Sequence, residues 1–291
     1  STVVIGLGVV FLMGNLGYLQ FGVWELLLRL WPLFIVALGL DLIIGRQKPW
    51  AALAGIGVGV LATAGILWLV LSSPLAVTLN REAVTMPLGE AQAARGTLSQ
   101  PVGKLVVSGG ASPANLLEGD TAVVSTQSLR KELNASGSKA TFDLSASGFS
   151  SYTPFTGSAN QETWTLKLND KVTYDLSLKT AVGEQVVNLS GLTINDARFE
   201  MAVGRQEVTL PASSAGHVEI RSAIGEVLIY VPKGTLVRVR VEKALTVLQA
   251  PLDFTQAGNM VYSPGAENAA NVLEVDVKNA IGSVRLLQIV P

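Results

Sequence analysis

Few residues in this sequence could support catalysis, and they do not form a recognised catalytic arrangement. The chain has one histidine, His217, which follows Gly216 in a turn before an alternating apolar segment. A catalytic triad needs a hydroxyl and a carboxylate on either side of the imidazole, and the sequence indicates neither partner. Gly109-Gly110 is not followed by the Gly-Lys-Ser/Thr of a phosphate-binding loop. We therefore predict that the protein is not an enzyme.

The sequence also offers little for binding a metal or a cofactor. It contains no cysteine, which excludes disulfides, thiolate metal sites and cysteine nucleophiles. A single histidine cannot form a histidine cluster, and no run of Asp and Glu has calcium-loop spacing. The net charge of -1 gives no electrostatic basis for nucleic-acid binding. We expect no cofactor, no metal, no nucleic acid and no small-molecule substrate.

The composition predicts a membrane domain over residues 1–72. Only 15% of the residues are charged, whereas soluble domains have about 25%. The loop that carries Arg46 and Lys48 should be cytoplasmic by the positive-inside rule. We thus expect a multi-pass protein of the inner (cytoplasmic) membrane, with its C-terminal region on the periplasmic or extracellular side. A re-entrant second span would reverse these sides. Apolar runs long enough to cross a bilayer predict transmembrane helices at about residues 2–19, 30–44 and 50–71.

Several residues of the predicted spans are candidate contacts. Trp24 and Trp31 fall near span ends, where aromatic side chains reach the membrane interface. Gly55 and Gly59 belong to a row of small residues that lets helices approach closely. Packing among the protein's own spans is the simpler explanation of that row, and an interface with another membrane protein is the alternative. Asp41 could be an ion or proton site, although a position near the headgroups, within reach of Arg46, is favoured.

The segment 145–162 is the most irregular part of the chain. It is rich in Ser, Thr and Gly and contains Phe149, Tyr152 and Phe155. A loop of this length is uncommon unless it binds something or lacks fixed structure. The three aromatic side chains are candidate partner anchors, or they fold back over the end of the neighbouring domain. We expect the partners to be other integral membrane proteins and the lipid bilayer.

The rest of the chain is organised by a repeat with a step of 21 residues. Ala-Val-Gly or Ala-Ile-Gly recurs around Gly183, Gly204 and Gly225, and a fourth copy ends in Gly282. Apolar residues alternate with polar ones around each copy, which is typical of half-buried strands. One copy cannot bury its apolar side alone, so the copies must stack. We predict a β-solenoid-like domain over 101–291, joined to the spans by a linker over 73–100, with two short strands meeting at each repeat-turn glycine.

These motifs resemble two known modules. Gly14-Asn15-Leu16-Gly17 and Leu30-Trp31-Pro32-Leu33 look like the multi-span N-terminus of bacterial LiaF-type proteins. Trp164-Thr165-Leu166-Lys167-Leu168 and the terminal Ala280-Ile281-Gly282-Ser283 resemble the toastrack β-repeat domain. The resemblance implies a bacterial membrane protein with a right-handed, solenoid-like toastrack domain and no known catalytic activity, and together with the apolar runs the predicted fold is three transmembrane helices followed by that β domain. Some relatives restrain a membrane histidine kinase in envelope-stress signalling.

Two functional hypotheses follow. In the first, the protein is a cofactor-free accessory subunit that braces a larger bacterial membrane complex, for example an energy-transducing one, as a scaffold. In the second, it is a LiaF-like regulator that holds a sensor kinase. A weaker third hypothesis is an outward-facing binder of surface polymer, with the loop 145–162 and Arg238 and Arg240 as contacts.

Overall fold

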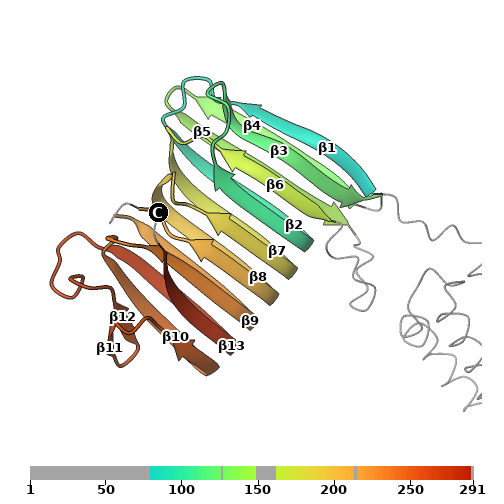
Figure 1. Cartoon of the computed structure of the whole chain (residues 1–291). Helices are drawn as coiled ribbons and strands as arrows, with labels where there is room; N and C mark the ends of the chain where they lie inside the picture. The colour runs from blue at the N-terminus through green and yellow to red at the C-terminus, as the bar shows by residue number, and fades with distance from the viewer. Residues whose placement is uncertain (1–78, 126, 149–161, 213–214, 290–291) are drawn as a thin grey trace, which may run out of the picture. The chain divides into compact units, whose positions relative to one another are not determined.

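The computed structural model describes residues 79–125, 127–148, 162–212 and 215–289, and this part of the chain is built from β-strands (Figure 1). The three predicted spans lie outside these ranges. Within the ranges, no helix has the length and hydropathy needed to cross a bilayer. The strands are β1 (Leu79–Pro87), β2 (Ala93–Gly109), β3 (Asn115–Val124), β4 (Gln127–Ser136), β5 (Lys139–Gly148), β6 (Thr163–Leu168), β7 (Thr173–Asn188), β8 (Thr193–Thr209), β9 (His217–Pro232), β10 (Val237–Gln249), β11 (Thr255–Ala257), β12 (Met260–Tyr262) and β13 (Leu273–Ile289).

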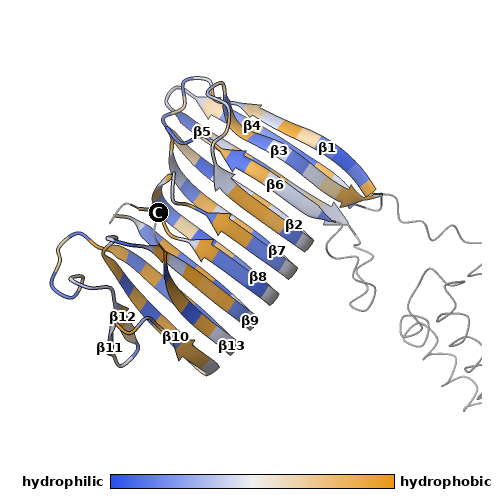
Figure 2. Cartoon of the chain, in the orientation of Figure 1, coloured by the Kyte–Doolittle hydropathy of each residue, from blue (hydrophilic) through white to orange (hydrophobic). Residues whose placement is uncertain are grey.

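The centre of the fold is a stack of parallel strands formed by the repeat. The strand order is β1-β3-β6-β2-β7-β8-β9-β13-β10-β12-β11, with β5 pairing with β2 and β4 with β5. Bands of hydrophobic and polar residues alternate along these strands (Figure 2). The apolar residues expected to correspond between copies are buried, with at most 2% of their surface exposed, which confirms the repeat: Leu176, Ala197 and Val218; Leu178, Phe199 and Ile220; Val187, Val208 and Ile229; Leu189, Leu210 and Val231.

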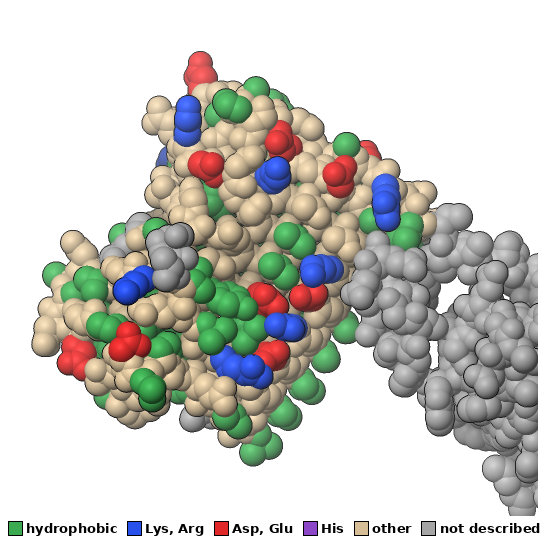
Figure 3. All heavy atoms as spheres, viewed as in Figure 1, with side chains coloured by type: hydrophobic (Ala, Val, Ile, Leu, Met, Phe, Trp, Pro, Cys, Tyr) green, Lys and Arg blue, Asp and Glu red, His purple; other side chains and the backbone are tan. Residues whose placement is uncertain are grey.

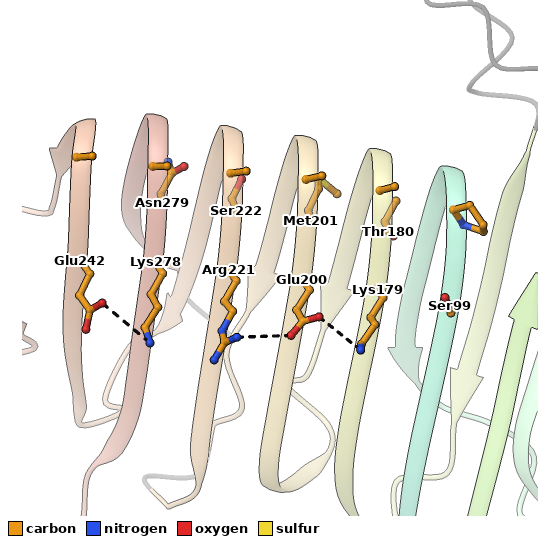
Figure 4. A pocket seen from close by; sticks show the side chains of 16 residues that line it. Ser99, Lys179, Thr180, Glu200, Met201, Arg221, Ser222, Glu242, Lys278 and Asn279 are labelled. Carbon is orange, nitrogen blue, oxygen red and sulfur yellow. Dashed lines mark ion pairs between the residues drawn. The ribbon is translucent and has the colours of Figure 1, made fainter.

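Each repeat strand must fold back on itself near its middle. β7 has 16 residues, which would span about 50 Å if straight. Only residues 189–192 separate it from β8, and they bridge at most about 18 Å. Yet Thr193, the first residue of β8, pairs with Thr173, the first residue of β7. The strand therefore bends so that its end returns close to its beginning, and Figure 4 shows successive strands curving over at this point. We call the two parts the first arm and the second arm.

Glycine occupies the bend of five neighbouring strands. Gly103, Gly183, Gly204, Gly225 and Gly282 have φ between 122° and 151°, and each pairs in register with the next. A Cβ on Gly204 would lie 1.9 Å from the carbonyl oxygen of Gly183, so a side chain is excluded by both conformation and space. Because glycine lets the pairing continue through the bend, each copy is one bent strand. The two short strands expected to meet at this glycine are the two parts of that one strand. We call these residues the glycine column.

Buried amides hold the two arms together behind the bend. The Nε2 of Gln185 donates to the Oγ1 of Thr180 at 3.0 Å and to the carbonyl oxygen of Glu200 at 3.1 Å. The Nε2 of Gln206 donates to the Oε1 of Gln185 at 2.9 Å. These bonds link first arm to second arm and β7 to β8, which fixes the register where the apolar core is thinnest.

The sheet begins earlier than the sequence indicated. β1 and the first arm of β2 lie within 73–100, which was expected to be a linker. The repeat pattern is hidden in β2 because small residues replace the usual large apolar ones. Gly96 is in register with Leu176, and a Cβ at Gly96 would collide with the ring of Phe142 from β5. The ring of Phe142 thus fills the part of the core that a large apolar side chain of the repeat strand fills in other copies.

β5 and β6 together take the place of one further bent strand beside β2. β5 pairs with the first arm of β2, and β6 pairs with its second arm. Residues 149–161 connect them, so the two ends of this segment, Gly148 and Glu162, lie at the bend. The backbone N–H of Lys104 donates to the carbonyl oxygen of Glu162 at 3.0 Å, which fixes the second of these ends.

The C-terminal strand does not follow the order of the sequence. β13 inserts between β9 and β10, with Gly282 in register with Gly225. The segment 251–267 contains the hairpin β11–β12, and β12 pairs with Arg238–Arg240 of β10. This hairpin forms the end of the sheet order beyond β10.

Candidate interaction surface

The outer face of the first arms carries rows of charged side chains that run across the strands. Glu200 lies 3.6 Å from Lys179 and 3.9 Å from Arg221, and Lys278 lies 4.0 Å from Glu242 (Figure 4). These five residues, in register on β7, β8, β9, β13 and β10, are called the charge row. Exposed pairs contribute only up to about 1 kcal/mol each. The row thus matters mainly as a fixed pattern of positive and negative charges.

Glu219 is the best-buried carboxylate of this face, and three cations surround it. Its side chain is 8% exposed and lies 2.8 Å from Arg198, 2.7 Å from Arg221 and 3.6 Å from Lys278. Burial raises the pKa of this carboxyl, but the hydrogen bonds from Arg221 and Arg198 outweigh it and hold the pKa below the ordinary value of 4.5. Glu219 therefore stays ionised and joins β8, β9 and β13.

His217 has two partners that the sequence did not indicate. Its Nδ1 is 2.9 Å from Asp196 of β8, and its Nε2 is 3.1 Å from Asp276 of β13. Both nitrogens can donate only in the imidazolium form. Burial lowers the pKa of His217, but the hydrogen bonds to Asp196 and Asp276 outweigh it and raise the pKa above 6.5. The group is therefore a cross-strand ion pair that joins β8, β9 and β13.

The arginines of β10 belong to the same face. Arg238 lies 2.7 Å from Glu274, and Arg240 lies 3.8 Å from Asp276. Both carboxylates belong to β13. The guanidinium groups are therefore engaged within the face, and the structure does not leave them as a separate cationic site.

A groove runs across six strands between the charge row and the bend. Its volume is about 1030 Å³. Alanines form its floor, and all of them are exposed on the outer face. Alanine is depleted at exposed strand positions, and its small size is what opens this groove. Five inter-strand steps of about 4.8 Å give a length of about 24 Å, enough for an extended segment or a four-turn helix. The floor residues are Ala181, Ala202, Ala223, Ala280 and Ala244.

Beyond the groove, a line of aliphatic side chains lies on the bend itself. They pair in register from β2 to β10, and the four on β7, β8, β9 and β13 occupy the middle position of Ala-x-Gly. Val203, Ile224, Ile281 and Leu245 are 43%, 48%, 46% and 75% exposed. Figure 3 shows a line of hydrophobic side chains along this edge of the domain. The set, called the aliphatic ridge, is Val102, Val182, Val203, Ile224, Ile281 and Leu245.

The structure describes only some of the residues singled out in the sequence. The repeat-turn glycines form four of the five members of the glycine column. The remaining candidate contacts lie outside the described residues: Trp24, Trp31, Gly55, Gly59, Phe149, Tyr152 and Phe155. Sequence reasoning missed the groove, the charge row and the ridge. Some contacts of the charged face could have been found from the sequence. Asp196 and His217 are separated by one repeat of 21 residues, and so are Arg198 and Glu219. Among the described residues, no group of three or more acidic or histidine side chains could hold a metal ion.

The bent parallel strands with their glycine column define a toast-rack domain, and comparison with known families agrees. Residues 76–230 match the N-terminal domain of toast_rack, DUF2154. Residues 1–43 match the LiaI-LiaF-like transmembrane region. The first match covers more than half of the chain, and the chain belongs to the toast-rack family. The second indicates that it is a membrane-associated protein of the LiaF-like type.

One solved structure agrees on the fold. A Clostridium sporogenes protein, described as a suspected cell adhesion protein, is 21% identical with a TM-score of 0.63, covering 73% of this chain and 100% of its own. A suspected adhesin of Bacteroides fragilis, covering 72% of this chain and 97% of its own, is 8% identical with a TM-score of 0.26, too low to support any argument. The first likeness shows the fold alone. Among curated proteins, none matches the chain.

Proposed function

We propose that the protein is a membrane-anchored, non-enzymatic regulator that restrains a membrane sensor histidine kinase by binding it. The observation that carries this proposal is the joining, in one chain, of a LiaI-LiaF-like transmembrane region over 1–43 and a toast-rack domain over 76–230. We place the toast-rack domain on the periplasmic or extracellular side of a bacterial inner membrane, where envelope stress is sensed.

The groove is the surface that suits this role. It is about 24 Å long, its floor is free of bulky side chains, and the charge row along it offers both signs of charge. An amphipathic segment of a partner could place charged residues against the charge row and small apolar residues against the alanine floor. The bent strands make the surface rigid, so binding would not require it to reorganise.

The test is a pair of matched substitutions on exposed strand alanines. Ala202→Arg fills the groove floor without touching the core, whereas Ala135→Arg adds the same side chain to β4, away from the groove. In a strain that lacks the gene, the natural chain and the Ala135→Arg variant should both restore low kinase output in unstressed cells. The Ala202→Arg variant should leave output close to that of the deletion strain. Unchanged kinase output after deletion would remove the regulatory proposal.

A second candidate function is bracing of a larger membrane complex. The observation that favours it is the rigid lattice of ion pairs across β8, β9, β13 and β10 around Glu219 and His217. A brace predicts that the native chain migrates with a large assembly in mild detergent and that this assembly falls apart without it. A regulator predicts an intact assembly and altered kinase output, so the two measurements separate the functions.

A further inference from the structure

The aliphatic ridge exposes hydrophobic surface in a straight line, and a soluble face would not keep such a line. Val203, Ile224 and Ile281 are nearly half exposed, and Leu245 is 75% exposed. Exposed alanines precede the ridge residues on the first arm, and charged side chains such as Glu200 lie beyond them. Contiguous exposed aliphatic residues mark a surface that contacts something apolar. Because the strands are parallel and in register, the side chains stand at one level, which suits a flat surface.

The chain joins the β domain at the same edge. Leu79, the first residue of β1, pairs with Val124 of β3. Further along these strands, Asp120 pairs with Thr165 of β6, which pairs with Val106 of β2. Residue 102, the ridge position of β2, lies four residues before Val106. Leu79 lies the same four residues before the position of β1 that is level with Val106, so Leu79 is level with residue 102. The described chain thus begins at the level of the bend, and Figure 1 shows it starting at that end of β1.

The connection to the membrane is short. The third predicted span ends at Leu71, and β1 begins at Leu79. The intervening residues 72–78 allow at most about 29 Å between the two ends even when fully extended. The predicted span is therefore joined to the β domain at the edge that contains Leu79, through residues 72–78 alone.

We propose that the aliphatic ridge lies against the lipid surface of the membrane that holds the chain. A second copy of the chain is a poorer occupant, because the ridge exposes only on the order of a few hundred Å², against about 800 Å² per partner in a stable interface. The flanking charges are already paired, as between Lys104 and Glu184 at 3.1 Å and between Arg205 and Glu226 at 3.6 Å. Contact with lipid is therefore apolar, and it does not depend on anionic headgroups.

The absence of cysteine from the sequence makes a direct test possible. Val203→Cys and, as a second reporter, Ile224→Cys place an environment-sensitive fluorophore on the ridge at exposed positions. Ser190→Cys places it on the exposed turn between β7 and β8, at the opposite edge of the same stack. The full chain is reconstituted into liposomes of zwitterionic lipid alone and of zwitterionic lipid with an anionic component.

The ridge labels should emit at shorter wavelength than the Ser190 label and lose fluorescence to nitroxide-bearing lipids in both compositions. The Ser190 label should instead respond to a water-soluble quencher. Ridge labels that are as accessible to the water-soluble quencher as Ser190 would overturn the proposal. Protection of the ridge in native membranes but not in liposomes would also overturn it, since a protein would then be the cover. Neither outcome bears on the kinase assay, so the two proposals fail separately.

Discussion

Substitution of Gly204 by alanine tests whether the bends of the stack are built as described. Its φ is 145°, where an L-residue is strained by about 1–2 kcal/mol. The added Cβ would lie 1.9 Å from the Gly183 carbonyl oxygen, and ordinary contact begins at 3.4 Å, so β7 and β8 must separate by about 1.5 Å (3.4 − 1.9). Such a gap breaks about two ladder hydrogen bonds at about 1 kcal/mol each. The total loss is about 4 kcal/mol.

A matched variant separates collision from backbone strain. Gly137 also has positive φ, 55°, but a Cβ there meets nothing within 4 Å, so Gly137→Ala should cost only about 1 kcal/mol. The difference of about 3 kcal/mol corresponds to about 6–12 °C in Tm for a domain of this size. Thermal unfolding of the full chain in detergent, followed by the β-sheet signal in circular dichroism, measures it. Equal melting of the two variants would show that the glycine column does not set the stacking distance.

Two further predictions concern the charged face. Glu219→Gln should lower the free energy of unfolding by about 2 kcal/mol, because Arg198 and Arg221 lose charge-assisted hydrogen bonds. The pKa of Glu219 is lowered in the folded chain, so the natural chain should lose the same stabilisation as pH falls below 4.5. The variant should not show this loss. His217 has a raised pKa when folded, so its stabilisation is fully present below pH 6.5 and is lost as pH rises through the folded value. The Tm of the natural chain should thus fall as pH rises above 6.5, and the Tm of His217→Gln should not. If the two curves of Tm against pH are parallel, the assigned pairing of His217 with Asp196 and Asp276 is contradicted.

The repeat could be predicted from sequence because its determinants are local and periodic. Alternation identified the buried positions, and Gly183 and its equivalents marked the bends. Two features of the fold could not be predicted in this way. The first arm of β2 was assigned to the linker because Gly96 lies where other copies have a large apolar residue, and Phe142 from another strand fills the space. The insertion of β13 beside β9 is non-local, since no repeat spacing relates Gly282 to Gly225.

The surface was harder to predict than the fold because it depends on neighbours across strands. The contact of Asp196 with His217 follows from adding one repeat length, but that of Asp276 with His217 spans 59 residues and needs the position of β13. The groove arises from a column of small residues that, read along one strand, is only a single alanine per copy. Exposure of the ridge likewise becomes visible only once the strands are placed side by side.

The most direct test of the account is crosslinking from the groove in living cells. A photoreactive amino acid replaces Ala202 in the full chain, and Ala135 serves as the matched position on β4. The account predicts an adduct with one defined membrane protein from position 202, lost when Ala223→Arg fills the adjoining floor, and no such adduct from position 135. Identical adducts from both positions, or an adduct that survives the blocked groove, would contradict the claim that the protein acts by binding a partner there.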